Sequence, residues 1–327
     1  MSTIGRLRAP DDETHPDPGV MLVSPIDPVG VMRRCGKTFH AASLLLPASV
    51  RRELAVLYAF CRVVDDCGDL VSGVSRDRAE SLLDTVEHCL DGRSDESPII
   101  AEFRALADRR GVPISLAHQL VGGVRSDIGC VRVATTEGLV RYAYRVASTV
   151  GLMMCRVLGV PREADPFAID LGIAMQLTNI SRDVRDDALS DRIYLPDELI
   201  AHDRVLRCAR GDGREEPAVA DAVARVLGMA DLYYDSAANG MRYLPGAVRP
   251  GIRAAAVNYR AIGAVIRRDP RTALGSRVAT SRMGKLTRSG GVLCQAAAET
   301  FTRHIASPHD QTLHGPIRPM LTHAAGS

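Results

Sequence analysis

Two aspartate clusters, more than one hundred residues apart, each follow a strongly apolar segment with helical periodicity. The first cluster occupies residues 65–69 (DDCGD) and the second occupies residues 183–187 (DVRDD). At about 100° per residue, Asp65 and Asp69 lie roughly 40° apart around a helix and about 6 Å apart along it. The two carboxylates therefore share one face of the helix.

The first cluster continues the apolar face of its helix. The face that ends at Asp65 also carries Leu54, Tyr58 and Cys61, with Arg62 at its margin. A carboxylate on an inward face is costly unless it is paired, protonated or bound to a metal ion.

The second segment repeats this arrangement. Its polar residues fall on the side that also carries Ile169, Ile173 and Ile180, and they are Gln176, Asn179, Asp183 and Asp187. Aspartates are common at solvated helix ends, but the repeated spacing and placement argue against that reading. Oxygen ligands without His or Cys suit Mg²⁺ or Mn²⁺, and Mg²⁺ typically completes its coordination with substrate phosphates. The clusters predict a metal-bridged phosphate substrate.

Composition narrows the class of protein. The 327 residues are 46% hydrophobic, and 41 basic residues balance 39 acidic ones, so the charge predicts no nucleic-acid partner. The eight cysteines are scattered, without a CxxC pair or a zinc-type spacing, and indicate reduced thiols in a cytoplasmic protein.

The sequence predicts no membrane-spanning segment. The N-terminus lacks the basic start and apolar core of a secretion signal, and the longest charge-free runs are far shorter than the ~20 residues that cross a bilayer. We expect a cytoplasmic protein that an apolar substrate draws to the inner face of the membrane. The sequence does not decide between a monomer and a weak dimer.

Helical periodicity dominates the chain and predicts one all-α domain with a central pocket. We expect a disordered leader at 1–28, the helical domain at 29–306 and a flexible tail at 307–327. The predicted helices cover residues 30–42, 48–70, 76–91, 98–110, 113–130, 136–158, 165–189, 196–205, 215–243, 249–268 and 290–304. Asp165-Pro166 is a clear helix start. From Phe167 to Ser181 only Asp170 is charged, so this helix should be central.

The small residues and the methionines of the central helices indicate where a pocket or a packed core would lie. Small residues on the helix at 136–158, among them Ala147 and Gly151, would either leave room for a long apolar substrate or allow close helix packing, and the sequence leaves both open. We expect Met153, Met154 and Met175 to fill the core.

Four strings of residues, in order, resemble the squalene/phytoene synthase family. They are residues 37–43 (KTFHAAS), 57–66 (LYAFCRVVDD), 176–187 (QLTNISRDVRDD) and 191–196 (DRIYLP), and the resemblance extends over roughly residues 30–290. Residues 39–43 and 244–252 are most similar to the bacterial phytoene synthases. The resemblance implies an isoprenoid synthase-type helical bundle around a central cavity. It also implies Mg²⁺-dependent condensation of two geranylgeranyl diphosphates, through prephytoene diphosphate, to phytoene, without NADPH.

The resemblance assigns roles by position. Asp65 and Asp69 match the first metal-binding motif, and Asn179, Asp183 and Asp187 match the second. Contacts to the prenyl diphosphate are implied for Lys37, Thr38, Tyr58, Arg62, Gln176, Arg182 and Arg282. Tyr259 matches a late tyrosine that lines the site, and either its hydroxyl or the released diphosphate would accept protons. Where the family usually has serines around the lysine, this chain has Gly36 and Thr38.

Two alternatives stay open. A squalene or dehydrosqualene synthase would use farnesyl diphosphate, with NADPH in the squalene case, although no Gly-rich dinucleotide loop follows a predicted strand. A non-catalytic scaffold on the same fold would have little reason to keep both aspartate clusters and their arginines.

Overall fold

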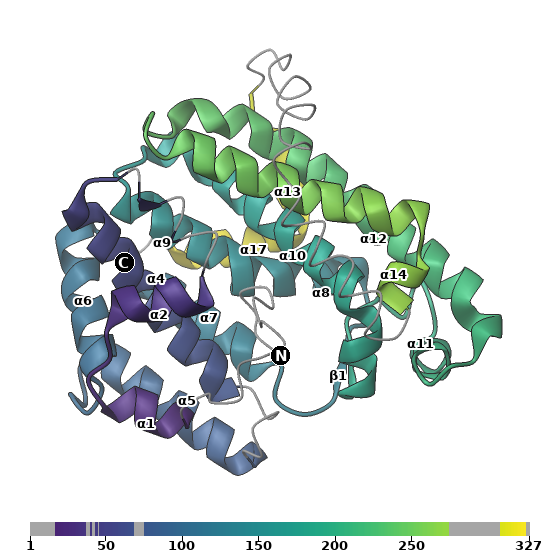
Figure 1. Ribbon diagram of the computed structural model, residues 1–327, viewed down its shortest axis with the longest axis horizontal. Coiled ribbons are helices and arrows are strands. Elements are labelled where there is room, and N and C mark those ends of the chain that lie inside the picture. Colours follow the sequence, from purple (N-terminus) through teal and green to yellow (C-terminus); the bar gives the residue numbers. More distant parts are fainter. Residues whose placement is uncertain are drawn as a thin grey trace.

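The computed structural model describes residues 17–36, 40, 43–44, 46–68, 75–274 and 308–324, with side chains up to residue 321. Within these residues the protein is a bundle of helices with one pair of two-residue strands (Figure 1), which confirms the predicted all-α class. The elements are α1 (Pro18–Val23), α2 (Pro28–Cys35), α4 (Ala48–Gly68), α5 (Arg76–Leu90), α6 (Pro98–Arg110), α7 (Ile114–Arg125), β1 (Val131–Arg132), α8 (Thr136–Ala143), η2 (Tyr144–Ser148), α9 (Thr149–Val157), η3 (Arg162–Ala164), α10 (Asp165–Leu189), β2 (Arg192–Ile193), α11 (His202–Ala209), η4 (Gly213–Glu215), α12 (Glu216–Gly240), η5 (Met241–Tyr243), α13 (Arg249–Arg268), α14 (Arg271–Leu274), η6 (Gln311–Ile317) and α17 (Arg318–Ala324).

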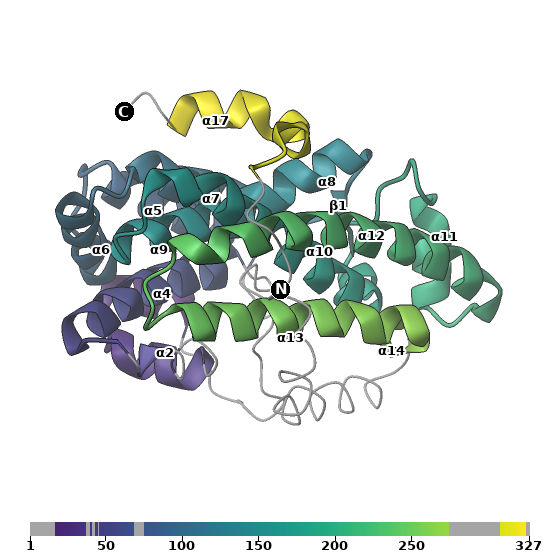
Figure 2. The same cartoon turned by 90° about the horizontal axis from the view of Figure 1, so that it is seen from above.

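The central element is α10, which begins at Asp165 with Pro166 in its first turn, as predicted. It packs against α9, α11, α12 and α13, so buried residues occur around its whole circumference. Figures 1 and 2 show α12 and α13 running alongside it. Because α10 is enclosed, each polar side chain on it must find a partner inside the protein.

A glycine allows α10 to approach the preceding helical segment closely. A Cβ atom added to Gly172 would lie 2.6 Å from Ser148 Cα and 2.7 Å from Ser148 N. The Ser148 hydroxyl donates a hydrogen bond of 2.7 Å to the carbonyl oxygen of Ile169 on α10. Ser148 ends the π-helical turn η2, which joins α8 to α9 without a break, so the helix predicted at 136–158 is confirmed through Val157.

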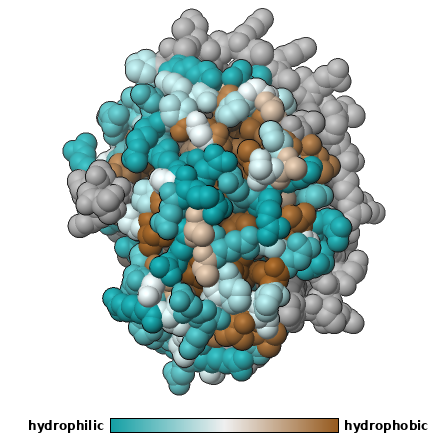
Figure 3. Space-filling view, turned by 90° about the vertical axis from the view of Figure 1, so that its left-hand side faces the viewer, coloured by the Kyte–Doolittle hydropathy of each residue, from teal (hydrophilic) through white to brown (hydrophobic). Residues whose placement is uncertain are grey.

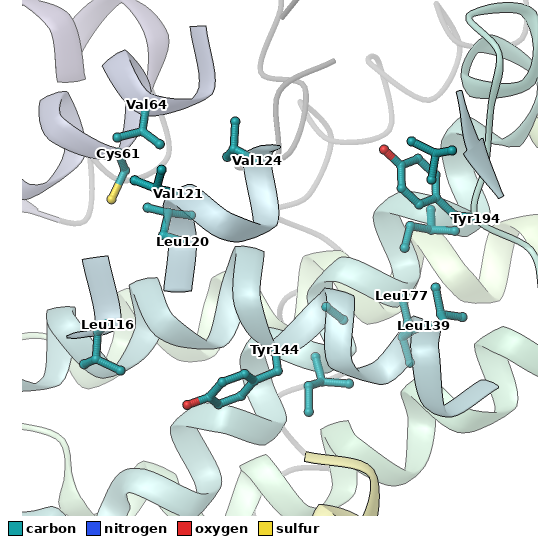
Figure 4. Packing of buried hydrophobic residues seen from close by; sticks show 14 of the residues in the cluster. Cys61, Val64, Leu116, Leu120, Val121, Val124, Leu139, Tyr144, Leu177 and Tyr194 are labelled. Atoms are coloured by element: carbon teal, nitrogen blue, oxygen red, sulfur yellow. The ribbon is translucent and has the colours of Figure 1, made fainter. Parts of the chain in front are cut away.

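The face of α4 that leads to the first aspartate cluster is part of the core. Cys61 is fully buried and Asp65 is 3% exposed. Figure 4 shows Cys61 and Val64 of α4 next to Val121 of α7, and all three belong to one apolar cluster. The predicted inward placement of Asp65 is therefore confirmed.

The helix predicted at 113–130 ends earlier than expected. α7 stops at Arg125, where the Ser126 hydroxyl donates 2.6 Å to the Gly123 carbonyl oxygen and competes with the helical hydrogen bonds. Gly129 then takes a left-handed conformation (φ 91°) that turns the chain into β1. β1 pairs in parallel with β2, with Val131 opposite Arg192.

The helix predicted at 196–205 is wrong for residues 196–201. The amides of Asp197 and Glu198 donate to the carbonyl oxygens of Val133 and Ala134, at 3.0 and 3.2 Å, instead of entering a helix. α11 begins at His202 and extends to Ala209. This long-range pairing leaves no periodic signal in the sequence.

Both ends of the described chain differ from the prediction of a disordered leader and a flexible tail. Residues 18–23 form α1, in which Met21 and Leu22 are buried. In the C-terminal segment 308–321, Ile317 is fully buried and η6 packs against α8, and Figure 2 shows α17 lying over α7. The predicted helix at 290–304 lies outside the described residues.

Two features of the structure concern contact with a membrane, namely the distribution of apolar residues on the surface and the apolar character of the helices. On the face shown in Figure 3, apolar residues lie in separate areas among polar ones. Among the described residues, no helix combines the length and the apolar character needed to span a bilayer. Peripheral contact with a membrane stays a prediction.

We predict that Gly172→Ala destabilises the protein by about 1–3 kcal/mol, because the new methyl group overlaps the backbone of Ser148. The matched control is Gly228→Ala on the exposed side of α12, where an added Cβ meets nothing within 4 Å. That substitution should stabilise by roughly 0.5–1 kcal/mol, since alanine is the better helix former. Denaturant unfolding of both variants checks this, and equal stabilities would contradict the close approach.

Candidate active site

A large apolar cavity lies between η2, α9, α10, α12 and α13. Counting its open mouth, it contains about 1110 Å³ of space. The lining is almost entirely aliphatic or aromatic, and its polar side chains are Gln176, Asn179, Tyr259 and the thiol of Cys155. Small-molecule pockets are lined mainly by apolar side chains with a few polar groups, so this cavity suits an apolar ligand with a polar end.

The cavity leads along α10 toward the second aspartate cluster. The lining residues of α10 run from Phe167 through Met175 to Gln176 and Asn179. Asp183 follows Asn179 by one helical turn, about 6 Å further along the axis on the same face. The lining of the apolar space therefore ends one helical turn before Asp183.

Gln176 and Asn179 form the polar part of the lining. Asn179 is 8% exposed, and its side-chain nitrogen donates 3.3 Å to the side-chain oxygen of Gln176. The other end of this amide, Asn179 Oδ1, is buried and has no hydrogen-bond partner in the described part of the chain. A buried amide oxygen in this condition is available as a ligand atom.

Arg182 and Asp183 form an ion pair beside the cavity. The guanidinium donates from Nε to Oδ1 at 2.9 Å and from Nη2 to Oδ2 at 2.7 Å. Burial opposes the charge of Arg182, but the neighbouring Asp183, Tyr259 and Asp187 outweigh it and raise the pKa of the guanidinium. A permanent cation therefore lies among the acids of the second cluster, and Asp187 itself is buried.

The first cluster repeats this pairing on α4. Arg62 donates from Nε to Asp66 Oδ2 at 2.9 Å and from Nη2 to Oδ1 at 2.5 Å. Sequence reasoning did not assign a role to Asp66. The half-buried Tyr58 lies one turn before Arg62, and a Cβ on Gly36 would be 2.8 Å from the Tyr58 ring. A side chain at position 36 would therefore require the Tyr58 ring to shift, and Gly36 allows the ring to lie where it does.

Several predicted site residues lie outside the described residues, and they are Lys37, Thr38, Asp69 and Arg282. Their roles stay predictions. Of the described ones, the structure brings Gln176, Asn179 and Tyr259 together around the cavity, with Arg182 and Asp183 next to them. α9 packs against both α4 and α10 and so links the two acidic helices.

Two of the three methionines expected in the core also line the cavity. Met154 and Met175 pack against the core and border the cavity, whereas Met153 is fully buried in the core. The small residues of the same region both leave room for a ligand and allow close helix packing, the two possibilities that the sequence left open. Ala147 and Gly151 line the cavity, and Ser148 makes the close helix contact.

A buried hydrogen-bond network beside the second cluster was missed from the sequence. The Asp127 carboxylate accepts hydrogen bonds of 2.7 Å from the hydroxyls of both Tyr142 and Tyr194. Burial raises the pKa of Asp127, and the two tyrosine hydrogen bonds partly oppose that rise. Tyr194 and Asp187 border the same small hollow, so the network holds the chain that follows α10. Only the tertiary fold brings these residues together.

Comparison with known proteins identifies the family of this chain. The family model described as squalene/phytoene synthase matches residues 32–284. The chain belongs to the squalene/phytoene synthase family. The phytoene synthase of Rhodobacter capsulatus is 34% identical over 299 residues, which cover 90% of this chain and 86% of that one. The 15-cis-phytoene synthase of a Paracoccus species is 37% identical over 262 residues, covering 76% and 84%.

Solved structures of lower identity confirm the predicted isoprenoid synthase-type fold. A dehydrosqualene synthase determined with a ligand superimposes with a TM-score of 0.65 at 23% identity, covering 82% of this chain and 95% of that one. The squalene synthase of Alicyclobacillus acidocaldarius gives 0.58 at 22% identity, covering 76% and 97%.

We predict that Tyr194→Phe lowers the free energy of unfolding by about 1–3 kcal/mol, because the buried Asp127 carboxylate loses a donor. The lost hydrogen bond favours the charged carboxylate. The variant should therefore raise the pKa of Asp127 further and lose more stability at a pH above that pKa than at a pH below it, where the group is protonated.

The control for this prediction is Tyr243→Phe, since the Tyr243 hydroxyl bonds only to the exposed Arg242 among the described residues. Denaturant titrations at the two pH values measure the difference. A loss of stability that does not change with pH would contradict the assignment of a charged Asp127.

Proposed function

We propose that this protein is a phytoene synthase of carotenoid biosynthesis. It joins two geranylgeranyl diphosphates head to head, through prephytoene diphosphate, to phytoene, and it releases diphosphate in both stages. The observation that carries this proposal is the identity of 34% and 37% to phytoene synthases over most of their lengths. The apolar cavity that adjoins the acidic end of α10 supports it independently.

The chemistry needs a space without water. The carbon–oxygen bond of one substrate breaks, and its electrons leave with diphosphate. The double bond of the second substrate attacks the resulting allylic cation, and loss of a proton closes a cyclopropane ring. This intermediate loses its diphosphate in turn, rearranges and loses a proton to give the central double bond. Water would capture either cation, so the aliphatic lining protects the reaction.

The described acids fit Mg²⁺. Carboxylates of Asp65, Asp183 and Asp187, together with the buried Asn179 Oδ1, offer only oxygen atoms, the donors that Mg²⁺ prefers. By resemblance Asp69 joins them. When bound, the ion neutralises charge that develops on the leaving diphosphate.

The two Arg–Asp pairs prepare the site for an anion. Without substrate, Asp66 and Asp183 neutralise Arg62 and Arg182, which would otherwise be buried charges without counter-ions. A diphosphate offers each guanidinium new oxygen acceptors in bidentate geometry. We assign further diphosphate contacts to Lys37, Thr38 and Arg282 by resemblance alone.

Three polar side chains complete the substrate site. Tyr58 and Gln176 contact the substrate, and Gln176 does so from the cavity wall. Tyr259 also lines the cavity, and it is close enough to Arg182 to contribute to the raised pKa of the guanidinium. Its hydroxyl is one proton acceptor for the cation intermediates, and the released diphosphate is the other.

A product assay tests the proposed function. The protein with Mg²⁺ should convert geranylgeranyl diphosphate to phytoene, identified by mass, without NADPH, and a chelator should stop diphosphate release. Product from farnesyl diphosphate alone would identify a squalene or dehydrosqualene synthase instead. No diphosphate release from either substrate would support the scaffold alternative.

We predict that Asp183→Asn lowers turnover by at least about 100-fold, because the leaving diphosphate loses electrostatic stabilisation. Circular dichroism should show an intact fold. The matched control is Asp221→Asn, which removes an exposed carboxylate paired with Arg225 on α12. Turnover of Asp183→Asn equal to that of the control would contradict the role of the second cluster.

A further inference from the structure

Asp170 is a buried carboxylate on α10 that the prenyl chemistry does not use. It is fully buried, and it is absent from the cavity lining although its neighbour Leu171 is part of it. Among the residues that the structure describes, its ion-pair partners are two histidines, and no Lys or Arg lies within ion-pair distance. Burying a carboxylate without Lys or Arg beside it costs free energy unless another positive charge is near.

Both histidines come from the C-terminal segment 308–321. His309 Nε2 lies 2.9 Å from Asp170 Oδ2, and His314 Nε2 lies 2.8 Å from Asp170 Oδ1. The two imidazole side chains are 5% and 6% exposed, and their ring centroids are 4.4 Å apart. One atom from each of the three side chains lies within 4.8 Å of the other two.

We propose that Asp170, His309 and His314 form a binding site for a divalent transition metal ion of the Zn²⁺ class, separate from the acidic clusters. Two imidazole nitrogens and one carboxylate oxygen are a typical donor set for Zn²⁺, whereas the clusters on α4 and α10 offer oxygen atoms alone. The fourth position is filled by water or by the second carboxylate oxygen.

The distances fit an ion shared by these groups. With Zn–N and Zn–O bonds of about 2.0–2.2 Å, ligand atoms at tetrahedral angles lie roughly 3.3 Å apart. The observed nitrogen–oxygen distances of 2.8 and 2.9 Å are to different oxygens of Asp170, and the three ligand atoms lie within 4.8 Å of one another. An ion would therefore shift the two rings relative to the carboxylate until tetrahedral separations are reached.

The surrounding contacts support a structural role for this site. The Tyr233 hydroxyl donates 2.9 Å to the Leu313 carbonyl oxygen, next to His314, and fixes the segment on α12. The His309 and Phe167 rings meet edge to face, with centroids 5.4 Å apart and an interplanar angle of 81°. Phe167 lines the apolar cavity, so an ion here would fasten the C-terminal segment behind the cavity wall.

Metal titration of the chelator-treated full chain tests this proposal. With excess Mg²⁺ present to fill oxygen-only sites, one equivalent of Co²⁺ should bind and give the intense visible absorption of a tetrahedral site. Zn²⁺ should displace it and raise the melting temperature. Absence of a bound equivalent in the wild-type chain would overturn the proposal, because hydrogen bonds alone would then hold the segment.

The matched variants separate metal binding from hydrogen bonding. In His314→Gln the amide can still donate a hydrogen bond to Asp170, but the imidazole ligand is lost. Changing a residue that only supports a metal ligand typically lowers metal affinity by about 10–100-fold, and we expect His314→Gln to lower the affinity for Co²⁺ by more than that. His118→Gln, which alters a partly exposed histidine paired with Asp91, should bind the ion normally. Binding that survives His314→Gln but is lost in Asp183→Asn would place the ion at the acidic cluster and reject the site. The readout is metal content, so it does not depend on prenyl transfer.

Discussion

The enclosure of α10 is the constraint on which the rest of the structure depends. This helix is covered by α9, α12 and α13, yet it carries polar and charged groups from Asp170 to Asp187. Each of them costs desolvation free energy unless a partner is supplied. Arg182 meets Asp183. Asp170 meets two histidines from the C-terminal segment.

One side of the helix is different. On the side that faces the cavity, Asn179 Oδ1 accepts no hydrogen bond from any described residue. The apolar lining of the cavity begins next to Asn179. A buried amide oxygen without a described partner, beside an apolar cavity, is available to a ligand. The fold thus separates a hydrocarbon compartment from a charged end, as a prenyl diphosphate requires.

Elements with strong local signals could be predicted from the sequence, and α10 is the clearest case. Its start at Asp165-Pro166 and its apolar circumference fix both its limits and its central place. The sequence did not reveal that the Ser126 hydroxyl competes with the helical hydrogen bonds and ends α7. Residues 196–201 could not be predicted, because the pairing of Val133 and Ala134 with Asp197 and Glu198 is a long-range contact. The ordered C-terminal segment was also not predicted from the sequence, since the contact of His309 and His314 with Asp170 is long-range as well.

For the candidate site, periodicity placed Asp65, Asn179 and Asp187 inside, and the structure agrees. The sequence could not show that Arg62 pairs with Asp66, or that Met154 and Met175 line the cavity. Side-chain direction at that detail depends on neighbouring helices. The assignment of Lys37, Thr38, Asp69 and Arg282 rests on resemblance.

The account is tested most directly by a crystal structure with Mn²⁺ and a non-ionising thiolo analogue of geranylgeranyl diphosphate. Anomalous scattering from Mn²⁺ should appear within bonding distance of Asn179, Asp183 and Asp187, with the hydrocarbon chain running along α10 past Met175 toward Phe167. Manganese bound elsewhere, or a hydrocarbon chain outside this cavity, would contradict the account.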